Sequence, residues 1–198
     1  MKNLIAVAFL VAFSAFGDNY QAGTYNVDPA HSKVGFEIPH LVISSVEGRF
    51  NEYKGELTLG KEFSQSALSA EVGVGSVDTA VKDRDGHLKS ADFFDAAKYP
   101  KMTFKSKRFE GSPAAFRLVG DLTIKGVTKE VAFDAKYLGA VKDAFGNEKV
   151  AIDATTKISR KDFGLTWGKM VEAGPIVGDT VTIQLKLQAA RPIKSAAR

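Results

Sequence analysis

The chain has 198 residues, with 27 Lys and Arg against 23 Asp and Glu, and it contains no Cys. Without Cys there is no disulfide bridge, and attachment to a membrane through a lipidated cysteine is excluded. The formal net charge of +4 is not gathered into a basic stripe carrying aromatic side chains, so the composition does not indicate a nucleic-acid partner.

The first 17 residues have the pattern of a secretory signal peptide. Lys2 gives a positive start, residues 4–13 are uninterruptedly apolar, and small residues at Ala15 and Gly17 precede a polar sequence that begins at Asp18. The apolar run is too short for a bilayer-spanning helix, which takes about 20 residues. We therefore expect a cleaved leader over residues 1–17 and an exported protein; an uncleaved N-terminal anchor is the alternative.

After the leader, apolar and polar residues alternate with the period of two that β-strands require. A short extended segment over residues 24–27 leads into eight predicted strands, at 33–38, 50–59, 68–74, 102–107, 116–124, 127–137, 150–158 and 180–189. Lys125 and Gly126 separate two of them as a tight hairpin turn, because glycine readily adopts the positive φ that such turns need. No gap before the last strand holds a long crossover helix, so neighbouring strands are expected to be antiparallel.

One stretch, residues 76–100, breaks the alternation. It has helical spacing in two short pieces, with Asp78 or Thr79 as the candidate N-cap of the first piece and Ser90 or Asp92 as that of the second. Because eight antiparallel strands lose their exposed edges by closing, the sequence predicts an all-β fold. This is an eight-stranded antiparallel barrel over residues 18–190, with a short helical insertion between strands three and four and a disordered tail over 191–198.

The alternation also predicts an apolar lumen, because the opposite face of the strands carries Lys, Glu, Asp, Thr and Ser. An eight-stranded barrel is either filled by its own side chains or holds one small ligand, and the pattern alone does not choose. The candidate ligand-contacting residues are Phe36, Ile38, Phe50, Leu57, Val72, Val74, Phe93, Phe94, Met102, Phe104, Leu122, Phe133, Trp167 and Ile183. Trp167, the single tryptophan, is either a core plug or a lid over the lumen.

Arg84, Asp85 and His87 are the most concentrated polar group of the insertion. They either rim the mouth of the barrel and orient a ligand headgroup, or they join the insertion to the barrel wall.

The histidines do not predict a metal site, since no two of them form an HxH or HxxxH pair. The chain has no GxSxG elbow, and Asp28, His31 and Ser32 are typical of a turn that satisfies its own backbone. The sequence therefore predicts neither a metal site nor a catalytic residue.

Five blocks of the sequence resemble the motifs of the YceI-like family, in the family's order. They are DPAHS at 28–32, RDGHL at 84–88 running into DFFD and YP by residue 100, GDLTIKGVT at 120–128, RKDFG at 160–164 and VGD at 177–179. The resemblance covers roughly residues 24–189.

This resemblance implies a lipocalin-like barrel, usually periplasmic, whose elongated apolar cavity binds polyisoprenoids or isoprenoid quinones. It transfers no catalytic residue. We therefore expect a periplasmic carrier, not an enzyme, with an isoprenoid lipid or quinone as bound ligand and no other cofactor, making transient membrane contact; a homodimer is left open. The alternatives are an enzyme acting on such a lipid in the same cavity, and a stress-related interaction protein with a filled barrel.

Overall fold

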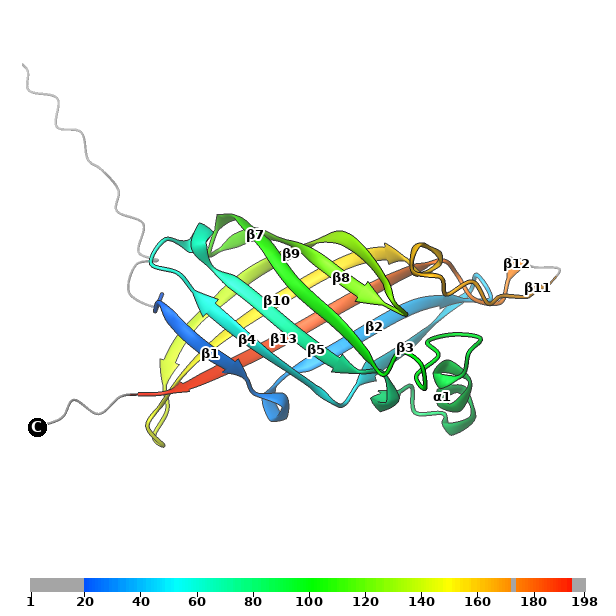
Figure 1. Cartoon of the computed structure of the whole chain (residues 1–198), viewed down its shortest axis with the longest axis horizontal. Coiled ribbons are helices and arrows are strands. Elements are labelled where there is room, and N and C mark those ends of the chain that lie inside the picture. Colours follow the sequence, from blue (N-terminus) through cyan, green and yellow to red (C-terminus); the bar gives the residue numbers. More distant parts are fainter. Residues whose placement is uncertain (1–19, 172–173, 194–198) are drawn as a thin grey trace, which may run out of the picture.

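The chain closes a β-sheet on itself. The computed structural model describes residues 20–171 and 174–193, so the predicted leader lies outside the described residues. β1 (Gly23–Val27) pairs with both β4 (Tyr53–Leu59) and β13 (Thr180–Pro192), and all pairings are antiparallel. Figure 1 shows the resulting elongated barrel, with its strands inclined to the long axis. Closure removes the sheet edges on which other chains would pair.

The barrel has eight strand positions around its circumference, as predicted. At three of these positions the strand is broken into two shorter strands. β1 continues into β2 (Lys33–His40), β3 (Ser44–Phe50) into β4, and β5 (Ala67–Gly73) into β6 (Val77–Asp78). The uninterrupted strands besides β13 are β7 (Lys101–Ser112), β8 (Ala115–Ile124), β9 (Val127–Lys142) and β10 (Asn147–Ser159). Single 3-10 turns lie at Pro29–His31, Phe63–Gln65, Val74–Ser76 and Arg160–Phe163, and a small second sheet pairs β11 (Met170–Val171) with β12 (Gly174–Pro175).

The predicted strand over 50–59 in fact begins earlier and is interrupted. β3 runs from Ser44 to Phe50, and the chain then bends where the Ser76 hydroxyl accepts hydrogen bonds from the backbone N–H groups of Asn51 and Glu52, at 3.1 and 2.9 Å. β3 was missed because Gly48 stands at an inward position where an apolar side chain would have signalled a strand. A Cβ atom at Gly48 would lie 2.3 Å from the Phe36 ring, so the glycine makes room for that ring.

The predicted hairpin between β8 and β9 is confirmed. Lys125 and Gly126 both have positive φ, 49° and 77°, which is the type I′ pattern that matches the twist of the flanking strands. Glycine is also required at position 126 because the Tyr99 ring lies 2.7 Å from where a Cβ atom would be. This turn and the end of the insertion therefore pack together.

The insertion forms one helix, α1 (Lys82–Lys89), between β6 and β7. The predicted N-caps are wrong, since Val81 occupies that position without a side-chain hydrogen bond. Asp85, in the first turn of the helix, instead accepts hydrogen bonds from the backbone N–H and hydroxyl of Thr79, at 2.8 and 2.6 Å. The acceptor that fixes the start of this helix therefore lies inside the first turn.

The predicted second helical piece is also wrong. Residues 91–94 and 96–98 form turns, and Asp95 has a φ of 52°, which interrupts helical geometry. Among residues 20–171 and 174–193, no helix has the length and apolar character needed to cross a membrane.

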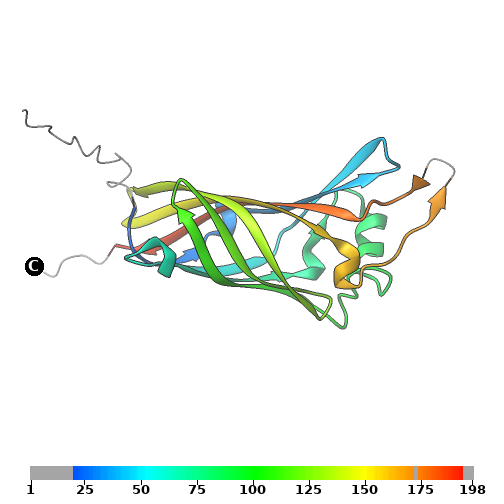
Figure 2. The same cartoon turned by 90° about the horizontal axis from the view of Figure 1, so that it is seen from above.

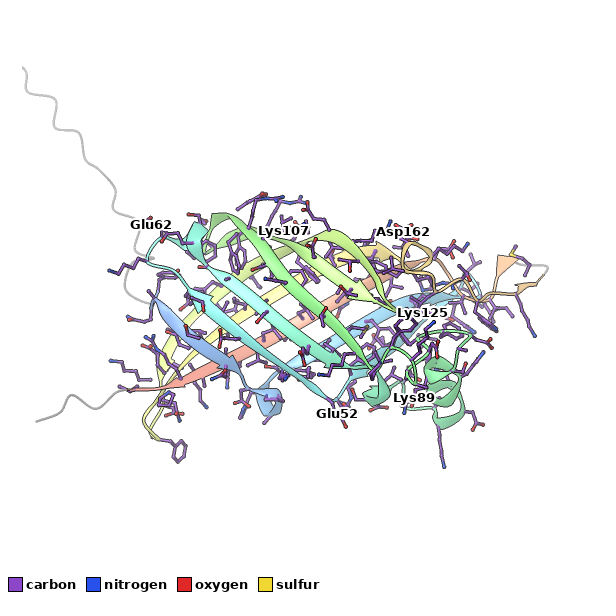
Figure 3. The ribbon with its side chains drawn as sticks, in the orientation of Figure 1. Glu52, Glu62, Lys89, Lys107, Lys125 and Asp162 are labelled. Carbon is purple, nitrogen blue, oxygen red and sulfur yellow. The ribbon has the colours of Figure 1, made fainter. Side chains whose placement is uncertain are left out.

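Large side chains fill one end of the barrel. Phe63 of the β4–β5 connection packs edge-on against Phe109 and Phe116, with ring centroids 5.6 and 4.9 Å apart. Leu118 and Ile152, both 2% exposed or less, belong to the same cluster. Most charged side chains lie outside, as the labelled Glu62, Lys107 and Lys125 show in Figure 3, and Glu148 and Arg160 are buried exceptions. The apolar interior predicted from the alternation is therefore observed.

A buried ion pair lies next to the closing pairing of β1 with β13. Glu148 is 5% exposed, and its Oε2 atom accepts hydrogen bonds from Arg191 Nε at 2.7 Å and from the Tyr25 hydroxyl at 3.0 Å. The Arg191 guanidinium also lies over the Tyr25 ring, 4.6 Å from its centroid. The predicted tail over 191–198 is therefore wrong at its start: β13 extends to Pro192, while residues 194–198 lie outside the described residues.

Replacing Arg191 by Met should lower the free energy of unfolding by about 3–5 kcal/mol, because the Glu148 carboxylate would be left buried without its cation. The matched control is Arg108→Met, which removes an exposed pair with Glu110 and should change stability by less than about 1 kcal/mol. Urea unfolding followed by circular dichroism measures both, and equal losses would contradict a special role for the buried pair.

Alkaline pH should destabilise the fold through Tyr25. Burial, and then the hydrogen bond to Glu148, raise the pKa of this hydroxyl above its usual value of about 10. A raised folded-state pKa means that the unfolded chain loses its proton first, so stability falls as pH rises above about 10, by up to about 1.4 kcal/mol per pH unit. Urea unfolding between pH 8 and 11 should show a shallower decline for Tyr25→Phe than for the unsubstituted chain.

Candidate ligand-binding site

A cavity of about 350 Å³ occupies the barrel on the side away from the Phe63 cluster. This volume lies within the range of roughly 300–1,000 Å³ that is usual for small-molecule sites. Its walls come from strands all around the barrel, and α1 and the segments over 163–167 and 176–177 complete it at one end. Side chains therefore do not fill the barrel completely, which speaks against the filled-barrel alternative.

Nearly all residues predicted to face the lumen line this cavity. They are Phe36, Ile38, Phe50, Val72, Phe93, Phe94, Met102, Phe104, Leu122, Phe133, Trp167 and Ile183. Val34, Leu185 and Leu187, which continue the same alternation along β2 and β13, line it as well.

Leu57 and Val74 do not line the cavity. Leu57 is 4% exposed and packs in the filled end of the barrel with Tyr25. Val74 is 1% exposed and lies in the 3-10 turn after β5, where its N–H donates to the Pro100 carbonyl at 2.9 Å. The strand alternation has ended at that turn, so it no longer predicts which way the Val74 side chain points.

The polar group of the insertion divides between the cavity and the fold. Arg84 and His87 line the cavity, and Asp85 does not. Arg84 Nε donates to the Thr79 hydroxyl at 2.7 Å and its Nη2 to the Thr79 carbonyl at 2.8 Å, while Asp85 accepts from the same threonine. Asp85 therefore braces the insertion. Arg84 does so too, yet within the described residues it has no carboxylate partner.

His87, Phe93 and Trp167 form an aromatic group at the mouth. The His87 ring is edge-on to both other rings, with centroids 5.0 Å apart in each case, and its Nε2 lies 2.9 Å from Asp92 Oδ2. Trp167 is partly exposed and lines the cavity, so it lies at the mouth like a lid and is not a buried core plug.

Arg160 holds the segment that carries this tryptophan. It is 5% exposed and lines the cavity. Its Nη1 donates to the carbonyls of Leu165 and Trp167, both at 2.6 Å, and its Nε to the carbonyl of Gly178 at 2.8 Å. A carboxylate oxygen of Asp179 lies 3.2 Å from Nη2. Sequence reasoning missed this role because backbone carbonyls as partners leave no trace in residue type.

Ile176, Val177 and Leu165 also line the cavity and were not predicted. Their segment has no periodic alternation, and only its motif blocks at 160–164 and 177–179 could have drawn attention to it.

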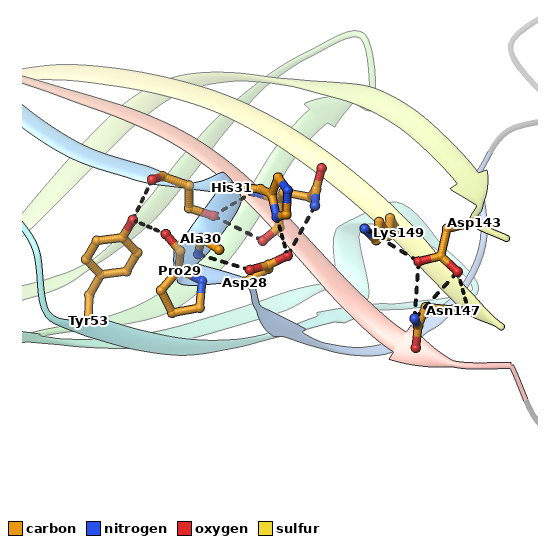
Figure 4. Close-up of polar contacts among 10 residues, drawn as sticks. Asp28, Pro29, Ala30, His31, Tyr53, Asp143, Asn147 and Lys149 are labelled. Atoms are coloured by element: carbon orange, nitrogen blue, oxygen red, sulfur yellow. Dashed lines mark hydrogen bonds and ion pairs between the residues drawn. The ribbon is translucent and has the colours of Figure 1, made fainter. Parts of the chain in front are cut away.

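The turn at Asp28, His31 and Ser32 does not line the cavity. Figure 4 shows its hydrogen bonds. Asp28 Oδ2 is 2.7 Å from His31 Nδ1, and this hydrogen bond holds the pKa of the Asp28 carboxyl below its usual value. The Ser32 hydroxyl instead donates to the carbonyl and accepts from the N–H of Gln188 in β13, at 3.1 and 2.9 Å. These residues form the predicted turn and fasten it to the barrel. Residues 20–171 and 174–193 contain no group of three His, Asp or Glu that could hold a metal ion.

The fold and the site together define a closed antiparallel barrel with an apolar internal cavity, whose mouth carries Arg84 beside the aromatic group of His87, Phe93 and Trp167. The chain belongs to the YceI-like domain family, whose model matches residues 25–189. The resemblance noted in the sequence is therefore confirmed.

Named relatives and solved structures agree with this assignment. A UPF0312 protein of Vibrio parahaemolyticus is 32% identical over 190 residues, covering 94% of this chain and 95% of that protein. The crystal structure of BcnA from Burkholderia cenocepacia matches with a TM-score of 0.71 at 25% identity, over 82% of this chain and 99% of that one. A polyisoprenoid binding domain from Saccharophagus degradans shares the fold, with a TM-score of 0.64 at 16% identity over 85% and 98% of the two chains.

Replacing Arg160 by Met should loosen the Trp167 segment and lower the free energy of unfolding by about 3 kcal/mol, because several buried carbonyls lose their donor at about 1–3 kcal/mol each. Fluorescence of the single tryptophan should shift to the red and become more accessible to quenchers. Arg160→Lys should not restore it, since lysine lacks the planar fork of donors. Lys161→Met, an exposed neighbour, is the control, and a red shift of similar size there would contradict the assignment.

Proposed function

We propose that this chain is a periplasmic binding protein that holds the apolar tail of an isoprenoid lipid or quinone in its barrel and shields it from water. The observation that carries the proposal is the cavity of about 350 Å³ inside a closed barrel, with walls that are apolar almost throughout. The leader-like residues 1–17 support export, and the shared fold of a polyisoprenoid binding domain supports the ligand class.

Burial of the apolar tail favours the bound lipid over a lipid exposed to water, but it gives little selectivity between lipids. Each buried methylene is worth about 0.8 kcal/mol, so roughly 20 of them give about 16 kcal/mol, near the practical limit of non-covalent binding. In a cell, however, the competing environment is the bilayer, which is as apolar as the barrel. The net free energy of transfer is therefore small, and selectivity has to come from cavity shape and from polar groups at the mouth.

The mouth offers suitable groups for a headgroup. Arg84 and His87 stand where the cavity wall changes from aliphatic strands to the insertion, and both present N–H donors. A quinone carbonyl or another acceptor at the end of the lipid would match these donors, with the tail directed toward Phe133 and Leu187 deeper along the barrel wall.

Binding without chemistry is favoured by the residue types around the cavity. Within the described residues no Asp or Glu lines it, and Arg160 is bound to backbone carbonyls. General acid–base catalysis needs a group that can accept or release a proton near the substrate, and His40, Tyr53 and His87 are such groups in the cavity wall. The Tyr53 hydroxyl donates to the Ser32 carbonyl at 2.6 Å, and His87 Nε2 lies 2.9 Å from Asp92 Oδ2, so both have partners within the protein. Because the rest of the wall is almost entirely apolar, the arrangement supports a carrier better than an enzyme acting on the same lipid.

Replacing Ile183 by Trp should fill the cavity and reduce uptake of an isoprenoid quinone at least tenfold. The matched control is Gln184→Trp, because the next residue of β13 is exposed and does not line the cavity. Purified proteins would be incubated with quinone-loaded vesicles and separated from them, and the bound quinone would be measured by its absorbance after extraction. Equal uptake by both variants, or no uptake by the unsubstituted chain, would refute the proposal.

A further inference from the structure

Aliphatic side chains project into water at the open end of the barrel. Val42 and Ile43, in the turn between β2 and β3, are 66% and 89% exposed, and Met170 of β11 is 74% exposed. We call Leu41, Val42, Ile43 and Met170 the apolar tip. Figure 2 shows that the β2–β3 hairpin and the β11–β12 pair extend beyond the barrel at the end that carries α1.

The two halves of the apolar tip are joined to each other and to the cavity. The Leu41 N–H donates to the Ile176 carbonyl at 3.0 Å, and His40 forms a β-bridge with Val177. His40, Ile176 and Val177 all line the cavity. Apolar surface therefore continues from the tip into the lumen, along the route that a ligand entering the mouth would take.

The backbone of the apolar tip is strained at two of its residues. Leu41 and Val42 have φ values of 51° and 67°, in the left-handed region. That region disfavours bulky and above all β-branched residues, and hairpin turns normally place Gly, Asn or Asp there. This turn therefore has neither the residue types that tolerate positive φ nor burial of its exposed aliphatic side chains to stabilise it. Strain of this kind persists mainly where function requires it.

The chemistry of the tip fits a bilayer better than a protein partner. The tip lacks the Tyr, Trp and Arg anchors that dominate protein interfaces, and so few residues fall well short of the roughly 800 Å² per partner that stable complexes bury. Lys82 and Lys169 lie at the same end, and neither has an acidic partner among the described residues. Unpaired lysines beside an aliphatic surface suit anionic headgroups above acyl chains.

We propose that the apolar tip inserts into the surface of a lipid bilayer, with Lys82 and Lys169 against anionic headgroups, so that the mouth of the barrel opens onto the membrane. This inference rests on the proposed function, since it explains how the ligand passes between bilayer and cavity without crossing water. The docked partner is the bilayer itself. The apolar tip inserts into it both when the cavity takes up a ligand and when it releases one.

The test is sedimentation of the purified protein with vesicles of phosphatidylcholine and phosphatidylglycerol. The double variant Val42→Ser, Ile43→Ser should bind vesicles at least tenfold more weakly than the unsubstituted chain. The matched control is Phe145→Ser, which removes an 88% exposed aromatic residue from the β9–β10 turn at the opposite end of the barrel and should leave binding unchanged. Vesicle binding by the double variant equal to that of the unsubstituted chain, or an equal loss with Phe145→Ser, would overturn the inference.

A second arm separates this inference from the proposed function. Isoprenoid quinone added from ethanol, without vesicles, should load the double variant as fully as the unsubstituted chain, whereas loading from vesicles should slow at least tenfold. If neither protein takes up quinone from ethanol, the proposed function fails, and vesicle sedimentation still decides about the tip. If size-exclusion chromatography shows a dimer that the double variant abolishes, and neither protein binds vesicles, the tip is instead a contact between two copies and the inference is overturned.

Discussion

Closure of the barrel depends on the return of β13 to the first strand position, which β1 and β2 share. β13 pairs with β2 from Thr182 with Glu37 to Lys186 with Lys33, and with β1 in a short pairing of Asn26 with Ala190 and Val27 with Ala189. The buried Glu148 lies beside this short pairing, where Arg191 balances its charge and Tyr25 donates to it. An ion pair taken out of water stabilises a fold only when its geometry and hydrogen bonds are nearly complete. Here they hold the end of β13 against β1, and the cavity is enclosed because β13 returns to both β1 and β2.

The barrel is filled at one end and hollow at the other, and this asymmetry gives the molecule a direction. Stacked and edge-on aromatic rings around Phe63 fill the end next to the β1–β13 pairing. At the opposite end the strands alone leave an opening, which α1 and the segment held by Arg160 narrow without filling it. Both covering elements are held by arginines whose donors meet backbone oxygens. Arg84 and His87, the groups that would recognise a headgroup, therefore line the cavity on the elements that shape this end.

Much of this follows from the sequence, because alternation and turn chemistry are local signals. The Lys125–Gly126 turn and the inward face of the strands were predictable from residue type and spacing alone. β3 was not predictable, because its inward position 48 is a glycine. A glycine is needed there by the Phe36 ring on the neighbouring strand, which leaves no room for a side chain. The cavity-lining residues on the strands could be predicted from the same alternation that predicts the strands. Arg160 could not, because its partners are carbonyls brought to it by the fold.

The central claim is that an isoprenoid lipid occupies the apolar cavity of the folded protein in water. Native mass spectrometry of the protein, purified from its native cells without detergent, tests this most directly. We expect a folded species heavier than the polypeptide alone by the mass of one isoprenoid lipid or quinone. This extra mass should be lost in the variant Ile183→Trp, whose indole ring occupies the same space. A folded protein with the bare polypeptide mass, which stays bare after incubation with quinone-loaded vesicles, would contradict it.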